Sequence, residues 1–137
     1  MRFLFDHNQE PQLARAVNEL LKNSGHSAIP LRDKFDHGIA DIEWMQALAE
    51  EGDWAVISGD VRISKNKHER AAWLESGLPI FFLKKAWQKT SYWEKCSRLI
   101  WWTPHILEQA ERIEGAAGFW IPIGVRAKPK FEQVNIK

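Results

Sequence analysis

The sequence predicts an α/β fold in which helices cover both faces of a mainly parallel β-sheet. Segments typical of strands and of helices alternate along most of the chain, as in folds built from parallel strands and crossover helices. Two strand-like segments, 54–58 and 79–83, are continuously apolar, which a strand buried on both faces requires. With 137 residues, the chain has the length of one domain.

The N-terminal segment predicts two strands separated by a helix. An apolar strand at 2–5 precedes a helix that opens at Pro11, because proline fits the first helical turn. Gly25 is a typical residue for ending that helix, and a second strand covers 26–31. The polar residues that follow, 32–38, predict a loop.

The middle of the chain predicts two further helices and two buried strands. A helix begins at Asp41, after which apolar residues recur at helical spacing, and it ends at Gly52. The apolar strand 54–58 follows. A helix at 68–75 then leads to the apolar strand at 79–83.

The C-terminal third predicts a helical region interrupted by proline. Ser91 and Glu94 fit a capping box, in which each side chain satisfies a backbone donor of the other residue. About ten helical residues follow, toward Trp102. Pro104 is expected to break or kink the helix before a second helical run to Glu114.

The last residues predict a turn, a short strand and a tail. A turn at 115–118 precedes a short apolar edge strand at 119–125. Residues 126–137 are basic, and we expect them to be loosely held. The predicted organisation is therefore one domain over 1–125 with a basic C-terminal tail over 126–137.

Composition and motifs exclude several classes of protein. Cys96 is the only cysteine, so neither an intramolecular disulfide nor a zinc site of several thiolates can form. The sequence has no GxxxxGK[ST] and no GxGxxG motif, which leaves a P-loop triphosphatase or a dinucleotide-dependent dehydrogenase unsupported. No apolar run approaches the roughly 20 residues of a membrane span, and we expect a cytoplasmic protein with no membrane partner.

The net charge of +1 hides an uneven distribution of charge along the chain. Residues 1–53 contain five Lys/Arg and ten Asp/Glu, whereas residues 54–137 contain fourteen and eight. This pattern excludes a uniformly basic surface for nucleic acid. It leaves open an acidic site bordered by basic groups.

Three aspartates are predicted to meet at one edge of the sheet. Asp6 and Asp60 directly follow strands, and the carboxyl ends of parallel strands face the edge where ligands bind. Asp41 begins a helix between them. Because clustered carboxylates are costly unless something neutralises them, Mg²⁺ or Mn²⁺ is the natural partner. We therefore predict that Asp6, Asp41 and Asp60 bind metal and catalyse hydrolysis of a phosphodiester.

Polar and basic residues extend this predicted site. Asn8 could supply a carbonyl ligand or hold a metal-bound water. The side chains predicted to contact phosphate or RNA are basic and follow Asp60 in the sequence: Arg62, Lys65, Lys67 and Arg70, with Lys84, Lys85 and Lys89 further along.

Each acidic residue also has an ordinary structural interpretation. Asp41 could be a helix N-cap, Asp60 a turn residue, and Asp6 a cap for the next helix. Glu69 is expected only to pair with a nearby base, Lys65 or Arg70.

Eight tryptophans in 137 residues need an explanation of their own. Trp54 and Trp73 are predicted to be core residues. Tryptophan is also enriched in interface hot spots and stacks on unpaired bases. Four tryptophans in the C-terminal part are therefore expected to form a dimer or partner surface: Trp87, Trp93, Trp101 and Trp102.

The motifs around the aspartates resemble those of the PIN-like domains. Phe-Leu-Phe-Asp-His-Asn ends at Asn8, Ala-Asp-Ile-Glu-Trp contains Asp41, and Ile-Ser-Gly-Asp ends at Asp60. The most similar branch is that of the short proteins grouped with VapC-type toxins. The resemblance covers about residues 1–85.

This resemblance implies a three-layer α/β/α sandwich with a Rossmann-like strand order. It also implies Mg²⁺- or Mn²⁺-dependent cleavage of RNA, a cognate antitoxin protein as partner, and frequent homodimers. By position, Asp6, Asp41 and Asp60 would be metal-binding carboxylates, and Asn8 and Ser58 secondary polar groups. Larger members have a fourth acidic residue. After Asp60 the candidates for it are Glu69 and Glu75, and neither is in a convincing place.

Two functions follow from the sequence. The first is a metal-dependent endoribonuclease that acts as the toxin of a toxin–antitoxin pair. The alternative is a catalytically weak or inactive PIN-like scaffold that binds RNA or a protein partner.

Overall fold

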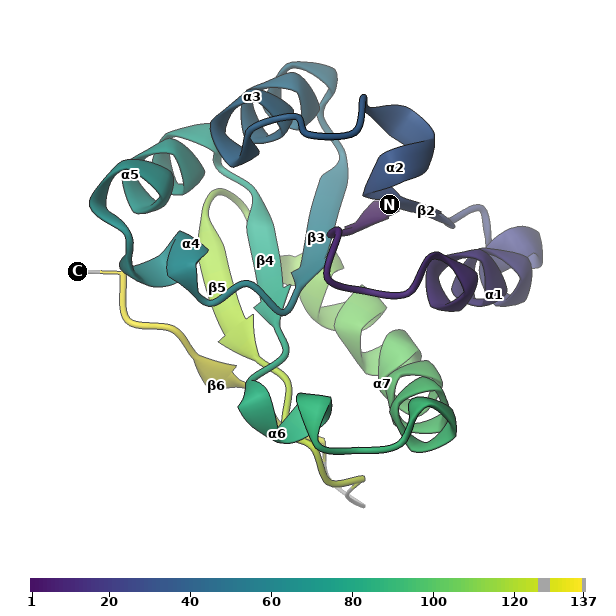
Figure 1. Cartoon of the computed structure of the whole chain (residues 1–137). Helices are drawn as coiled ribbons and strands as arrows, with labels where there is room; N and C mark the ends of the chain where they lie inside the picture. The colour runs from purple at the N-terminus through teal and green to yellow at the C-terminus, as the bar shows by residue number, and fades with distance from the viewer. Residues whose placement is uncertain (126–128, 137) are drawn as a thin grey trace.

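A six-stranded sheet forms the centre of the computed structural model, which describes residues 1–125 and 129–136 (Figure 1). Neighbouring strands are parallel except for the last pair, and the strand order is β2-β1-β3-β4-β5-β6. The strand bounds are β1 Arg2–Phe5, β2 Ser27–Pro30, β3 Trp54–Ser58, β4 Pro79–Phe82, β5 Ala117–Trp120 and β6 Glu132–Gln133. The predicted α/β fold with a mainly parallel sheet is confirmed.

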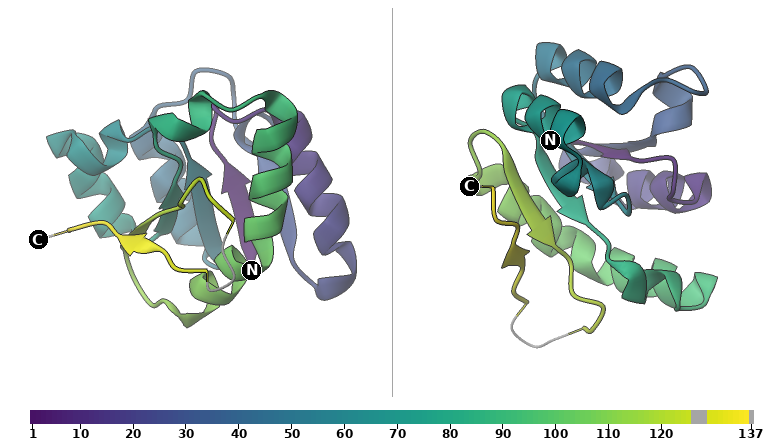
Figure 2. Two further views of the ribbon diagram at one scale, coloured as in Figure 1. Left: turned by 90° about the horizontal axis from the view of Figure 1, so that it is seen from below. Right: turned by 60° about the vertical axis from the view of Figure 1, so that its left-hand side comes forward.

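Helices cover both faces of this sheet (Figure 2). On one face lie α1 (Pro11–Leu21) and α7 (Tyr92–Arg112), and on the other lie α3 (Asp41–Glu51) and α5 (Lys67–Ser76). The remaining helices are single turns: η1 (Lys22–Ser24), α2 (Leu31–Lys34), α4 (Arg62–Lys65) and α6 (Lys85–Gln88). Within the described residues, no helix is both long enough and apolar enough to cross a membrane.

Successive residues of each strand face the two helical layers in turn. In β1, Phe3 and Phe5 belong to the core beneath α1 and α7, whereas Leu4 belongs to the core beneath α3 and α5. Every residue of β3 and β4 is buried, and these two strands lie inside the sheet. Burial on both faces explains the continuous apolar runs that predicted these strands.

The carboxyl ends of β1 and β3 bring two of the predicted site loops together. Phe5 pairs with Ile57, and the N–H of Asp6 donates to the carbonyl of Ile57 at 3.0 Å. The chain then leaves β3 at Ser58, so that Asp60 begins the next loop close to Asp6. Both aspartates therefore lie at the carboxyl ends of their strands, the place in the fold that the sequence predicts.

Two predictions for helical regions are corrected by the structure. The predicted loop at 32–38 begins with most of α2, a single helical turn. Helix α7 continues through Pro104 instead of breaking there. Proline removes only one backbone hydrogen bond, and Leu99 and Ile106 on either side of it are buried in the same core, so the helix does not end there.

The C-terminal segment is better anchored than its composition suggests. Strand β5 starts inside the predicted turn and lies between β4 and β6 rather than at the edge. Strand β6 pairs with β5, the N–H of Val134 donates to the carbonyl of Gly118 at 2.7 Å, and the Val134 side chain is buried. Loose attachment is therefore a wrong expectation for 131–134, while residues 126–128 and 137 of the predicted tail lie outside the described residues.

The tryptophans divide between the core and the surface. Trp54 and Trp73 are buried, which confirms their predicted place in the core. Trp87 and Trp102 are buried as well, so the prediction that they form a partner surface is wrong. Trp93 is 79% exposed and remains available to a partner.

Gly118 allows β5 to lie close to the residues that flank it. A β-carbon there would lie 2.7 Å from Cη2 of Trp73 and 2.9 Å from Cβ of Val134. We expect Gly118→Ala to lower the free energy of unfolding by about 1–3 kcal/mol, because both neighbours are buried and cannot move freely. Urea denaturation against Gly124→Ala, where a β-carbon meets no atom within 4 Å, checks this. Equal stability of the two variants would contradict it.

Candidate metal centre

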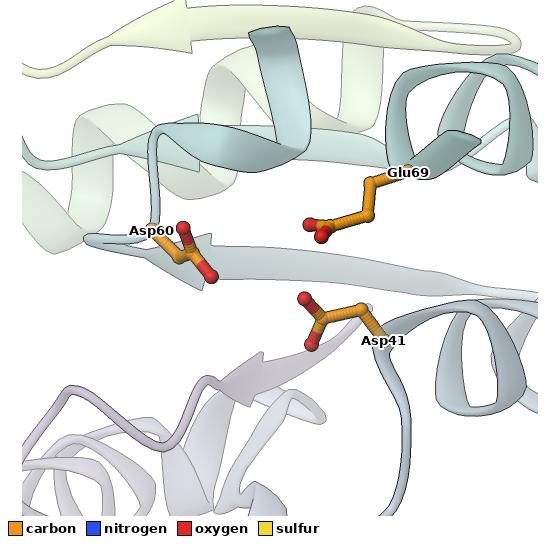
Figure 3. Close-up of side chains that lie close together, drawn as sticks. All are labelled: Asp41, Asp60 and Glu69. Carbon is orange, nitrogen blue, oxygen red and sulfur yellow. The ribbon is translucent and has the colours of Figure 1, made fainter. Parts of the chain in front are cut away.

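Three carboxylates from three elements converge at this sheet edge. Asp41 is the first residue of α3, Asp60 lies in the loop after β3, and Glu69 lies in the first turn of α5. Figure 3 shows their carboxylates pointing toward one another, and one oxygen of each lies within 4.8 Å of the other two. Oxygens on opposite sides of one cation are about 4–5 Å apart, since metal–oxygen distances run from about 2.0 to 2.6 Å.

Glu69 is the member of this cluster that the sequence interpretation misses. It forms no ion pair with Lys65 or Arg70, the expected partners, in the part of the chain that the structure describes. Asn66 caps α5 by accepting from the N–H of Glu69 at 3.3 Å, which fixes Glu69 in the first helical turn. The spacing between Glu69 and Trp73 could have indicated this position. Residues four apart share a helix face, and Trp73 lies in the core, so Glu69 lies on the inward face of α5.

The carboxylate of Glu69 has the burial and the charged neighbours of a metal ligand. Its Oε2 atom is buried and has no hydrogen-bond partner among the described residues. Burial, a shared hydrogen bond with Asp41 and the nearby negative charges raise the pKa of Glu69 above its ordinary value. A divalent cation would satisfy the orphan oxygen and neutralise the repulsion, so these residues fit Mg²⁺ or Mn²⁺.

Asp41 is held in place by the core beneath it. The indole Nε1 of Trp44 donates to Oδ1 of Asp41 at 3.0 Å, and Trp44 is fully buried. Asp41 is not the N-cap of α3, because Ala40 occupies that position and makes no side-chain cap. The Asp41 carboxylate faces those of Asp60 and Glu69 (Figure 3).

The carboxylate of Asp60 forms an ion pair with Arg62. Nε and Nη2 of Arg62 donate to Oδ1 and Oδ2 of Asp60, each at 2.8 Å, and the backbone N–H of Arg62 donates to Oδ1 at 3.1 Å. These bonds lower the pKa of Asp60 below its ordinary value. The Arg62 guanidinium thus occupies the Asp60 oxygens that a metal ion would need as ligands. It also places a positive charge where a phosphate could bind.

Asp6 lies beneath the cluster rather than in it. Only 4% of Asp6 is exposed, and its Oδ2 accepts from Ser58 Oγ at 2.7 Å while Oδ1 accepts from the N–H of His7. Burial raises the pKa of Asp6. It lines a cavity of about 280 Å³ with Asp41 and Asp60, but its carboxylate is not among the three within 4.8 Å.

Ser58 and Asn8 hold the loops around this cavity. Ser58 Oγ accepts from the N–H of Asp60 at 2.9 Å while it donates to Asp6, so it links the two aspartates. The Asn8 carbonyl oxygen accepts from the N–H of Gly59 at 3.1 Å. Both residues therefore hold the loops around the cavity together, and the carbonyl of Asn8 is bonded to the backbone of the loop after β3.

The predicted phosphate-binding residues fall into two groups. Lys65 and Lys67 are exposed beside the site, as phosphate contacts require. Arg70 instead donates from Nη1 to the carbonyl of Ser64 at 2.8 Å and from Nη2 to the carbonyl of Asn135 at 3.0 Å. Arg70 thereby ties the C-terminal segment to α5.

Comparison with known proteins adds one finding to this geometry. Residues 1–85 match the family model described as PIN like domain. The chain belongs to the PIN-like domain family. The matched region contains β1 to β4 and every acidic residue of the site, and domains of this family are typically nucleases. No curated protein and no solved structure gives a significant match.

The raised pKa of Glu69 predicts how metal-free stability depends on pH. The folded PIN-like domain holds the Glu69 proton more tightly than the unfolded chain does, so stability falls as pH rises above the ordinary value of 4.5 toward the raised pKa. We expect Glu69→Gln to flatten this fall and to stabilise the metal-free protein at neutral pH. Thermal unfolding in chelator across pH 4–8 measures the effect. A curve no flatter than that of Glu75→Gln, an exposed control on the same helix, would contradict it.

Proposed function

We propose that this PIN-like protein is a Mg²⁺- or Mn²⁺-dependent endoribonuclease and the toxin of a toxin–antitoxin pair. The observation that carries the nuclease proposal is the convergence of Asp41, Asp60 and Glu69, with an unpartnered carboxylate oxygen on Glu69. A bound cation would offset the mutual repulsion of these carboxylates.

The residues of the site would have different roles in phosphodiester hydrolysis. Asp41, Asp60 and Glu69 would hold the cation, and the buried charge of Asp6 would strengthen its binding. A bound divalent cation supplies Lewis-acid chemistry, polarising a phosphoryl oxygen and lowering the pKa of water. Arg62, released from Asp60, is placed to contact the phosphate.

Exposed lysines near the site would hold the RNA backbone. Lys65 and Lys67 lie on either side of the α4–α5 junction, next to Asp60 and Glu69. Their contacts with phosphates are independent of base sequence and weaken with added salt. This arrangement is the acidic site with basic neighbours that the charge distribution leaves open.

The binding-only scaffold remains the second candidate because of one observation. Arg62 occupies both oxygens of Asp60, which a metal ligand must free. A domain that keeps this ion pair in the presence of Mg²⁺ or Mn²⁺ would bind RNA without cleaving it.

Metal binding and cleavage, measured on the same preparation, test the proposal. We expect calorimetry to detect Mn²⁺ or Mg²⁺ at millimolar concentration or below, and labelled single-stranded RNA to be cleaved internally. Chelator should stop cleavage, and restored Mn²⁺ should restart it. RNA binding without metal binding would support the scaffold instead.

Arg62→Ala provides a sharper test of the Asp60 ion pair. Freeing Asp60 should tighten Mn²⁺ binding by roughly two- to fivefold, the range expected for an exposed ion pair. Cleavage should nevertheless slow, because the phosphate loses a cationic partner. Arg15→Ala is the matched control, since Arg15 forms a similar exposed pair with Asp33 away from the site. A variant with unchanged Mn²⁺ affinity would show that Arg62 does not compete with the metal.

The toxin role adds a partner that can be sought directly. We propose a cognate antitoxin, encoded next to this protein, and a homodimer as the assembly that it binds. Exposed Trp93 and Tyr92 at the start of α7 offer aromatic surface for such contacts. Inhibition of cleavage by the co-expressed neighbouring protein would support the proposal, and full activity in its presence would oppose it.

A further inference from the structure

A second cavity lies at the same sheet edge as the acidic cluster. Its volume is about 440 Å³, within the range of small-ligand sites. It opens where β4 and β5 end, and helix α6 and strand β6 border it. Its walls are largely aromatic and aliphatic, with lysines at the rim: Trp87, Trp120, Ile121, Phe131, Lys84 and Lys130.

The walls of this cavity are fixed by the fold. Nε1 of Trp87 donates to the carbonyl of Ile121 at 2.8 Å, and Nη1 of Arg98 donates to the carbonyl of Ile123 at 2.9 Å. Phe131 packs against core rings, with its centroid 5.1 Å from that of Trp102. The cavity is therefore formed before any ligand arrives, which lowers the cost of binding.

Positive charge and an aromatic face meet at the mouth of the cavity. Nζ of Lys84 lies 4.7 Å from the centroid of Trp120 and 3.6 Å from a carboxylate oxygen of Glu132. Lys85 and Lys89 are exposed on or next to α6, and neither forms an ion pair within the described residues. Aromatic faces beside unpaired lysines are the combination that binds single-stranded nucleic acid.

The register of the sheet places this cavity next to the acidic cluster. Ser58 of β3 pairs with Phe82 of β4, which pairs with Trp120 of β5. Paired residues of parallel strands point to the same face, so Trp120 lies on the face of Ser58 and about 10 Å from it, two strand spacings away. Trp87, Ile121 and Phe131 pack against the core on the other face, so the cavity lies across the carboxyl ends of β4 and β5. One extended polymer can reach both places.

We propose that this cavity receives an unpaired base of the RNA whose scissile phosphate lies at the acidic cluster. Trp120 and Phe131 supply apolar surface for the base, and Lys84 and Lys130 contact the flanking phosphates. The identity of the polymer rests on the proposed nuclease function, whereas the need for an unpaired base rests on the cavity alone. A duplex cannot enter, because its bases are stacked and paired.

Fluorescence anisotropy in chelator tests binding without cleavage. The probe is a labelled single-stranded RNA eight nucleotides long, together with its duplex and a series carrying one abasic position. We expect one abasic position to weaken binding at least about fivefold, as the loss of one stacked base would. We expect the duplex to bind more weakly than the single strand.

A pair of variants on α6 tests the place of binding. Ala86 lines the cavity, whereas Gln88 is exposed on the same helix and does not. Ala86→Glu and Gln88→Glu make the same change in charge, so a difference between them reports on the cavity. We expect the affinity of Ala86→Glu for the RNA to be at least about fivefold lower than that of Gln88→Glu. Equal affinities, or no abasic effect at any position, would overturn the proposal. A change in oligomeric state caused only by Ala86→Glu would overturn it too, by assigning the cavity to an interface between copies.

The same experiments separate this proposal from the nuclease function. If the protein binds RNA in a base-dependent way but never cleaves it, the proposal for the cavity is supported and the nuclease proposal is rejected. If RNA is cleaved at normal rates and Ala86→Glu and Gln88→Glu bind it with equal affinity, the nuclease proposal is supported and the proposal for the cavity is rejected.

Discussion

Asp41→Asn, Asp60→Asn and Glu69→Gln should each lower metal-dependent RNA cleavage by at least about 100-fold. Losing a residue that only orients a ligand costs about 10- to 100-fold, and these three are the candidate ligands themselves. Each amide keeps the size of the side chain but removes its charge, so the variants should fold. Initial cleavage rates and Mn²⁺ titrations by calorimetry measure both consequences, and affinity for the metal should fall together with the rate.

Two comparisons make this prediction specific. Glu75→Gln makes the same change on an exposed position of α5, and it should leave cleavage within about twofold of wild type. Asp6→Asn distinguishes the two sets of candidate ligands. The sequence predicts Asp6 with Asp41 and Asp60, whereas the structure places Glu69 with them. If Asp6→Asn abolishes metal binding while Glu69→Gln leaves it intact, the metal centre described here is assigned to the wrong carboxylates.

Asp41 and Asp60 could be placed from the sequence because their positions depend on topology. Alternating strands and helices predict parallel strands, and parallel strands place the residues that follow them at one edge. Asp60 follows β3 directly, and Asp41 starts the helix that leads into β3. No side-chain orientation on a helix had to be known for this inference.

Glu69 could not be placed in the same way, because its role depends on the rotation of α5. Four basic residues surround it in the sequence, so a surface ion pair is the simplest interpretation. Burial of Trp73 decides the rotation, and it turns Glu69, four residues earlier, toward the sheet edge. Strand β6 and the unbroken α7 likewise depend on tertiary contacts that override local preference.

Trp73→Ala should lower the free energy of unfolding by about 3–5 kcal/mol, the range for removing a large buried aromatic side chain. Trp73 is 0% exposed, and its Nε1 donates to the carbonyl of Leu78 at 2.8 Å, closing the turn into β4. Its ring meets that of Phe82 edge-on at 5.8 Å. Trp93→Ala deletes the same side chain from an exposed position and should change stability by less than about 0.5 kcal/mol. Urea denaturation of both variants measures the difference.

Trp73→Phe extends this prediction to the metal centre while keeping the fold. Phenylalanine retains one aromatic ring against Phe82 but loses the bond to Leu78, so α5 gains freedom to turn about its axis. Glu69 is carried on the same helix face, and its carboxylate should no longer stay within 4.8 Å of Asp41 and Asp60. We expect the affinity for Mn²⁺ to fall by about 10- to 100-fold, as for other residues that orient metal ligands. Native affinity in a folded Trp73→Phe protein would mean that Asn66 and the first turn of α5 orient Glu69 without help from the core.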